Sequence, residues 1–158
     1  MKQKALLALA VFFAATAAAA HEHHAPHKGT LVEFGEEFAH LELVLDGATG
    51  KLSAYALDGE AEKAVRLKQL EIVVAITGVK GLETITLKAQ GSPLSGEAPG
   101  DTSEFSAQSD SLKGVTQFDG VIKDITTRGT NFKDVKFNFP KGNEDAPALT
   151  PKKDEPKK

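Results

Sequence analysis

Residues 39–45, Ala39-His40-Leu41-Glu42-Leu43-Val44-Leu45, contain the pattern that decides the fold. Leucine occupies every second position, and a β-strand places every second side chain on the same face. The leucines therefore predict a half-buried strand whose other face carries His40 and Glu42. The preceding turn residues, Gly35-Glu36-Glu37, predict a hairpin that connects this strand to another at 30–34.

The same alternation recurs along most of the chain. It predicts strands at 70–76, 85–87 and 135–139, and the segments 52–57 and 121–127 are further strand candidates. Clusters of glycine, aspartate and asparagine at 46–50, 77–81 and 128–131 predict the turns between strands. Short strands at this spacing predict an all-β domain over residues 29–140, an antiparallel sandwich or barrel of about 7–8 short strands.

Three segments depart from this alternation. Asp58 is a residue type that caps helices, and we expect at most one helical turn over Gly59–Val65. Residues 91–114, rich in serine, glycine and proline, predict a long loop or a weak edge strand around Glu104–Gln108. Residues 141–158 are dominated by charges and prolines, so we expect a disordered charged tail.

The first 20 residues have the three parts of a secretory signal peptide. Lys2 and Lys4 precede an apolar run, and the segment ends in four alanines at 17–20. The apolar stretch is shorter than the roughly 20 residues that a membrane-spanning helix needs. Absence of cysteine excludes a lipoprotein anchor and any disulfide. We therefore expect residues 1–20 to be cleaved and the protein to be periplasmic or secreted, with no membrane association after cleavage.

Residues 21–28 form a histidine-rich arm with four of the five histidines, His21, His23, His24 and His27. Imidazole nitrogen suits copper, zinc and nickel, and short histidine tracts are typical of metal sites. If cleavage leaves His21 first, its free amine can join the His23 ring in a square-planar Cu(II) or Ni(II) set, or chelate copper together with its own ring. The alternative is an arm that only aids solubility.

His40 and Glu42 lie two residues apart on the predicted outward face of the strand at 39–45. An imidazole and a carboxylate at this spacing can share a metal ion, or they can form a hydrogen-bonded surface pair. Because the hairpin brings the arm beside this strand, we expect His27 to approach His40. The predicted ligands of a copper or zinc ion are His21, His23, His24, His27, His40 and Glu42.

Several segments of the first half resemble a known group of proteins. The matching segments are His27-x-Gly29, Gly35, and the runs 38–46, 49–52 and 55–59. They resemble small uncharacterised exported bacterial proteins with a histidine-rich start and an HxG…G…HxELVxD pattern. A similar opening occurs in the N-terminal region of periplasmic adaptor subunits of heavy-metal efflux pumps. The resemblance implies an all-β periplasmic domain that acts near copper or zinc. Lys28 departs from the pattern, which commonly has a glycine there.

Composition and motifs exclude several classes of function. The chain has 19 basic and 22 acidic residues and no basic block, which argues against nucleic acid and anionic membranes as partners. The sequence contains no nucleophile motif and no phosphate-binding glycine loop, and we therefore expect that the protein is not an enzyme.

Two functions are compatible with these sequence features. The first is an exported copper or zinc carrier or buffer, linked to a periplasmic metal-efflux or envelope protein. The alternative is a non-catalytic β-domain that docks on a larger envelope complex, with the histidine arm incidental.

Overall fold

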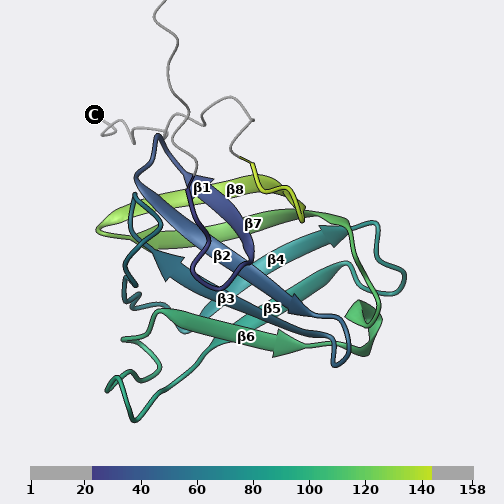
Figure 1. Cartoon of the computed structure of the whole chain (residues 1–158), viewed down its shortest axis with the longest axis horizontal. Helices are drawn as coiled ribbons and strands as arrows, with labels where there is room; N and C mark the ends of the chain where they lie inside the picture. Colours follow the sequence, from purple (N-terminus) through teal and green to yellow (C-terminus); the bar gives the residue numbers. More distant parts are fainter. Residues whose placement is uncertain (1–22, 144–158) are drawn as a thin grey trace, which may run out of the picture.

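Eight β-strands and one short helix make up the described part of this computed structural model, residues 23–143 (Figure 1). The strands are β1 (Thr30–Phe34), β2 (Ala39–Asp46), β3 (Lys51–Leu57), β4 (Glu71–Thr77), β5 (Thr84–Ala89), β6 (Glu104–Gln108), β7 (Phe118–Thr127) and β8 (Thr130–Phe139). Helix η1 (Asp110–Leu112) is a single 3-10 turn. Within residues 23–143, no helix is long and apolar enough to cross a membrane. The predicted leader (1–20) and residues 144–158 of the predicted tail lie outside the described residues.

All eight strands belong to one antiparallel sheet in the order β1-β2-β3-β6-β5-β4-β7-β8. The sheet curls until its edge strands, β1 and β8, lie close together, and the result is a nearly closed barrel (Figure 1). Asn143 links across the remaining seam: its Oδ1 accepts the Glu33 N–H at 2.7 Å, and its Nδ2 donates to the Glu33 carbonyl at 3.0 Å. Closure protects strand edges that would otherwise be open to pairing. The predicted antiparallel all-β fold is confirmed.

The hydrophobic core fills the barrel interior with alternate residues of the strands. In β2, Leu41 and Leu43 are fully buried, and Leu45 packs against the same core. The other large, fully buried side chains include Phe34, Leu52, Leu67, Ile72, Leu87, Phe105, Leu112, Phe118, Ile122 and Ile125. The inward face predicted for residues 39–45 is confirmed. The opposite face of β2 is buried as well, because His40 is 1% exposed and Glu42 is 0% exposed.

Strand β6 has a more central place than its composition suggests. It pairs with β3 on one side and β5 on the other, so it is an interior strand and not an edge. Phe105 is its one fully buried side chain, whereas Glu104 and Ser106 lie on the outer face. A five-residue strand with a single inward anchor shows little alternation, and backbone pairing on both sides keeps it in the sheet.

No helical turn forms at Gly59–Val65, where at most one was expected. Ala61 has a φ of 53°, in the left-handed region, which interrupts a right-handed helix. The segment is instead a turn in which the Asp58 carboxylate accepts the N–H groups of Glu62 and Lys63. The N-capping chemistry expected of Asp58 is therefore used to organise a loop.

Leu70 is the exception among the predicted strand residues. It precedes β4, which begins at Glu71, and it is 62% exposed. The inward positions of β4 are Ile72, Val74 and Ile76, as the alternation predicts.

Candidate functional site

The described part of the arm, residues 23–28, packs across the outer face of β2. Lys28 N–H donates to the Ala25 carbonyl at 3.0 Å, which closes a tight turn just before β1. Lys28 adopts a φ of 59°, a left-handed conformation that glycine adopts without steric cost. Ala25 packs against a small apolar cluster made of Leu31, Leu57 and Ala61.

Glu42 is the point where the arm is attached to β2. Its Oε1 accepts the backbone N–H groups of His27 and Gly29, both at 2.8 Å, and its Oε2 lies 2.7 Å from His27 Nδ1. Gly29 passes so close that an added Cβ would lie 2.5 Å from the Leu43 carbonyl oxygen and 2.8 Å from Glu42 Cγ. Only glycine allows the backbone to approach the carboxylate this closely.

Tyr55 forms the floor on which the His27 ring rests. The two rings stack with centroids 3.8 Å apart and planes 13° from parallel. Tyr55 lies directly opposite Glu42 in the β2–β3 pairing, so His27 contacts both members of one cross-strand pair. Burial, followed by the nearby charge of Glu104, raises the pKa of the Tyr55 phenol above its usual range. The phenol therefore stays neutral at physiological pH.

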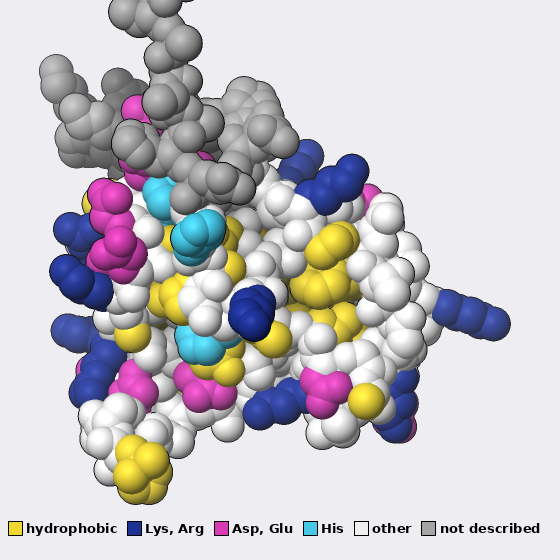
Figure 2. Space-filling view, in the orientation of Figure 1, with side chains coloured by type: hydrophobic (Ala, Val, Ile, Leu, Met, Phe, Trp, Pro, Cys, Tyr) yellow, Lys and Arg dark blue, Asp and Glu magenta, His cyan; other side chains and the backbone are white. Residues whose placement is uncertain are grey.

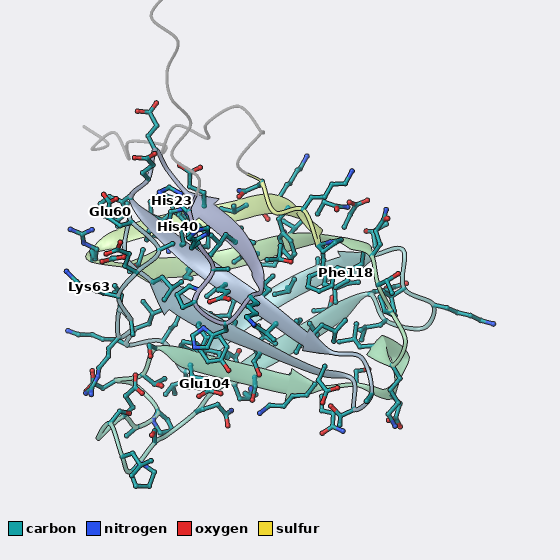
Figure 3. The ribbon with its side chains drawn as sticks, in the orientation of Figure 1. His23, His40, Glu60, Lys63, Glu104 and Phe118 are labelled. Carbon is teal, nitrogen blue, oxygen red and sulfur yellow. The ribbon has the colours of Figure 1, made fainter. Side chains whose placement is uncertain are left out.

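His40 occupies the next outward position of β2, where its surroundings determine its tautomer. Its Nδ1 lies 3.1 Å from the Asp58 carbonyl oxygen. A carbonyl can only accept, so Nδ1 carries the proton and donates. In the neutral ring Nε2 is then an acceptor, and it is buried without a hydrogen-bond partner. The His23 ring packs edge-on against His40, with centroids 4.8 Å apart (Figure 3).

The turn that presents the Asp58 carbonyl is stabilised by the negatively charged carboxylate of the same residue. Burial acts to raise the pKa of the Asp58 carboxyl, but hydrogen bonds from the backbone N–H groups of Glu62 and Lys63 and the charge of Lys63 lower it below its usual range. The carboxylate form thus fixes the turn that orients His40.

The structure sorts the predicted ligands into two contacting pairs, His23 with His40 and His27 with Glu42. The arm histidine that contacts His40 is thus His23, while His27, which we expected there, contacts Glu42. His24 is exposed, and His21 lies outside the described residues. Histidine side chains gather on the face of the barrel that the arm crosses (Figure 2). Within residues 23–143, no group of three or more histidine or acidic side chains is arranged to hold a metal ion.

Two participants were missed by the sequence reasoning, the Tyr55 ring and the Asp58 carbonyl. The Asp46-Gly47-Ala48-Thr49-Gly50 turn pairs Asp46 with Lys51, and counting back along both strands places Tyr55 opposite Glu42. The hairpin turn was therefore the signal for Tyr55. The Asp58 carbonyl has no comparable signal, because any residue offers a backbone oxygen.

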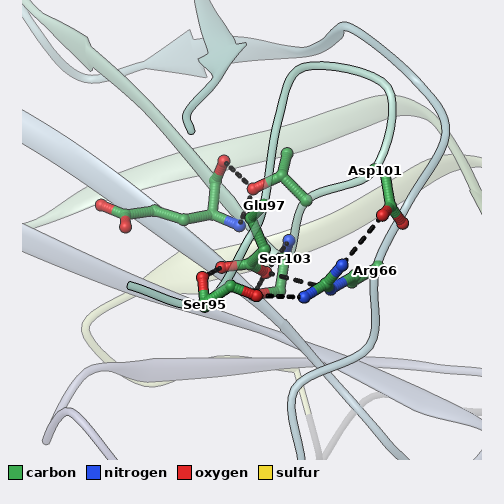
Figure 4. Close-up of polar contacts among 7 residues, drawn as sticks. Arg66, Ser95, Glu97, Asp101 and Ser103 are labelled. Carbon is green, nitrogen blue, oxygen red and sulfur yellow. Dashed lines mark hydrogen bonds and ion pairs between the residues drawn. The ribbon is translucent and has the colours of Figure 1, made fainter. Parts of the chain in front are cut away.

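A second polar cluster joins the loop before β6 to Arg66, which lies between β3 and β4. Glu97 accepts from the Ser103 backbone N–H and hydroxyl and from the Ser95 hydroxyl, while Arg66 bonds Asp101 and the Ser95 carbonyl (Figure 4). The hydrogen bonds from Ser103 and Ser95 lower the pKa of Glu97 below its usual range. All of these hydrogen bonds join members of the cluster to one another, and the cluster therefore serves to organise the loop.

Comparison of the chain with family models, curated proteins and solved structures finds no match.

Proposed function

We propose that the protein is an exported transition-metal carrier or buffer that binds copper or zinc through His40 and His23. The observation that carries this proposal is the buried His40 Nε2, which has no hydrogen-bond partner while its Nδ1 donates to the Asp58 carbonyl. A buried polar atom without a partner is costly, so natural proteins rarely keep one without a use.

The surroundings of His40 match those of a metal-ligating histidine. Such a ligand usually donates its second ring N–H to a carbonyl or carboxylate, which fixes the tautomer and directs the lone pair of the other nitrogen to the metal. The Asp58 carbonyl plays this part for His40. The adjoining ring of His23 offers a second imidazole. Two nitrogen donors suit copper and zinc.

The number of ligands supports a role in transfer. Structural zinc sites are closed by four protein ligands, whereas sites with fewer protein ligands keep positions open to exchange. His40 and His23 leave such positions for solvent or for a ligand from a partner. This arrangement supports a carrier or buffer, and the leader pattern of residues 1–20 supports export to a periplasmic metal-efflux or envelope partner.

Titration calorimetry with Zn(II) and Cu(II) tests the proposal. We expect saturable binding that is tighter than that of a free histidine peptide. His40→Asn keeps a donor for the Asp58 carbonyl and removes Nε2, so it is expected to weaken binding at least roughly tenfold.

Thr127→Val is the matched control, because the Thr127 hydroxyl is also buried without a partner but lies in β7. It is expected to leave the affinity unchanged. Absence of saturable binding, or equal binding by His40→Asn and the parent protein, would refute the proposed function.

A further inference from the structure

Glu42 directs both of its carboxylate oxygens at the arm, through the contacts with His27 and Gly29. We infer that Glu42 is a positioning residue: it holds the arm on β2 so that His23 lies against His40, and it does not bind the metal itself. This inference rests on the proposed function for its consequence, metal affinity. Its structural basis, the attachment of the arm, can be measured without metal.

The burial of Glu42 and the docking of the arm depend on each other. The Glu42 side chain is 0% exposed although it lies on the outward face of β2, because the arm covers it. A buried carboxylate is stable only when it is supplied with hydrogen-bond donors or positive charge. His27 and Gly29 supply these donors, and hydrogen bonds to a charged group are the stronger kind. Undocking of the arm would remove these hydrogen-bond donors from the Glu42 carboxylate, and this cost keeps the arm on β2.

The path of the arm then leads from the anchor to the proposed metal site. His27 is held by Glu42 and by stacking on Tyr55, and four residues earlier His23 contacts His40. Between them Ala25 packs in its apolar cluster with Leu31 and neighbours. The two contact points on β2 are only two residues apart. Loss of the His27 anchor would thus loosen the segment that carries His23 against His40.

A direct ligand role for Glu42 conflicts with these contacts. Each oxygen already has a partner at 2.7–2.8 Å, and the side chain has no exposed surface. A metal ion on Glu42 would have to displace the arm that carries His23. Glu42 therefore contributes to metal binding through His23. A double-mutant cycle of Glu42 and His23 distinguishes this positioning role from direct binding of the metal.

The test compares Zn(II) and Cu(II) affinities of the parent protein, Glu42→Gln, His23→Ala and the double variant. Glu42→Gln is expected to weaken binding roughly tenfold when His23 is present. It is expected to change binding less than about twofold when His23 is already alanine, because its effect acts through that residue. An equal loss in both backgrounds would overturn the inference, since a direct ligand or a general loss of stability acts regardless of His23.

Hydrogen exchange of the metal-free protein tests the anchor independently. In Glu42→Gln, the amides of residues 23–29 are expected to exchange about tenfold faster, while those of β4 and β7 are unchanged. Glu104→Gln is the matched control, because Glu104 also lies beside Tyr55, on the β6 side, and its side chain has no hydrogen bond or ion pair to residues 23–29. Unchanged exchange of residues 23–29 in Glu42→Gln would overturn the inference even if metal binds.

Gly29→Ala provides a second variant that leaves Glu42 intact. Its Cβ would collide with the Leu43 carbonyl and Glu42 Cγ, so it is expected to lift the arm and to reproduce both the faster exchange and the weaker metal binding. If the parent protein binds neither ion, the proposed function fails, and the exchange data alone decide whether Glu42 anchors the arm.

Discussion

Single residues on the outward face of β2 are as deeply buried as those that face the core. His40 and Glu42 are 1% and 0% exposed, and Leu41 between them is 0% exposed. The leucine is buried by the barrel interior, whereas the other two are buried by the arm and the turn at Asp58. Burial from two sides places polar groups in a low-dielectric setting, where each unsatisfied atom is costly. Unlike Glu42, His40 keeps one such atom.

Gly120 in β7 shows the opposite case, a residue whose value is its lack of a side chain. The Phe137 ring lies directly over it, inside the space that a Cβ would fill. Gly120→Ala is expected to lower the free energy of unfolding by about 3 kcal/mol, because the ring would be forced out of a packed core. Urea denaturation measures this change.

Gly47→Ala is the matched control for Gly120→Ala. The nearest atom to its Cβ would be 3.9 Å away, so a change of less than about 0.5 kcal/mol is expected. Equal effects of the two variants would show that the Phe137 ring moves aside freely.

Among the elements, the loop between β5 and β6 is organised by one carboxylate. Glu97 accepts three hydrogen bonds from Ser95 and Ser103. These bonds orient the segment that leads into β6, which explains how a stretch rich in serine and glycine keeps a defined path.

The lowered pKa of Glu97 predicts a pH dependence of stability. Because the folded pKa lies below the unfolded value of ~4.3, Glu97 stabilises the fold above that pH, and the contribution is lost as pH falls through the folded pKa. Glu97→Gln should therefore be less stable than the parent at pH 7, and the difference should shrink towards pH 3. Urea midpoints across this range measure it.

Glu83→Gln serves as the control for Glu97→Gln, since Glu83 is an exposed residue before β5. It is expected to leave the urea midpoint at pH 7 close to that of the parent. A constant gap between Glu97→Gln and the parent at all pH values would contradict the assigned cause.

On the scale of the whole molecule, the barrel is completed by segments that follow β8. The Pro140 carbonyl accepts the Thr30 hydroxyl at 3.1 Å, and Asn143 bonds both backbone groups of Glu33. Gly142 packs closely on the Leu31 carbonyl. Residues 140–143 thus bridge the seam between β1 and β8.

Asn143→Ala is expected to lower the free energy of unfolding by about 1–3 kcal/mol, because it removes two hydrogen bonds and leaves backbone groups of β1 without partners. Asn131→Ala is the control: its bonds to Asp124 and Thr126 are exposed, and a loss of less than about 0.5 kcal/mol is expected. Chemical denaturation compares them, and equal losses would argue against a seam held by Asn143.

The prediction from the sequence succeeded where the information is local. Alternation placed the leucines of β2 inward, and the turn at 35–37 placed β1 at 30–34. It was less complete where the chain bends. In β7 and β8 the buried positions change parity between Ile122 and Ile125 and between Phe132 and Val135, beside Asp134 with its φ of 52°. A face change of this kind interrupts the period of two on which the prediction depends.

The sequence by itself determined most of the strands, the inward faces of β2 and β4 and the presence of histidines near β2, because these follow from the spacing of neighbouring residues. Only the tertiary structure decided that β6 is interior, that His23 and not His27 meets His40, and that Glu42 is occupied by the arm. These features are contacts between residues far apart in the chain. Their energies depend on burial and on partners that exist only once the barrel has closed.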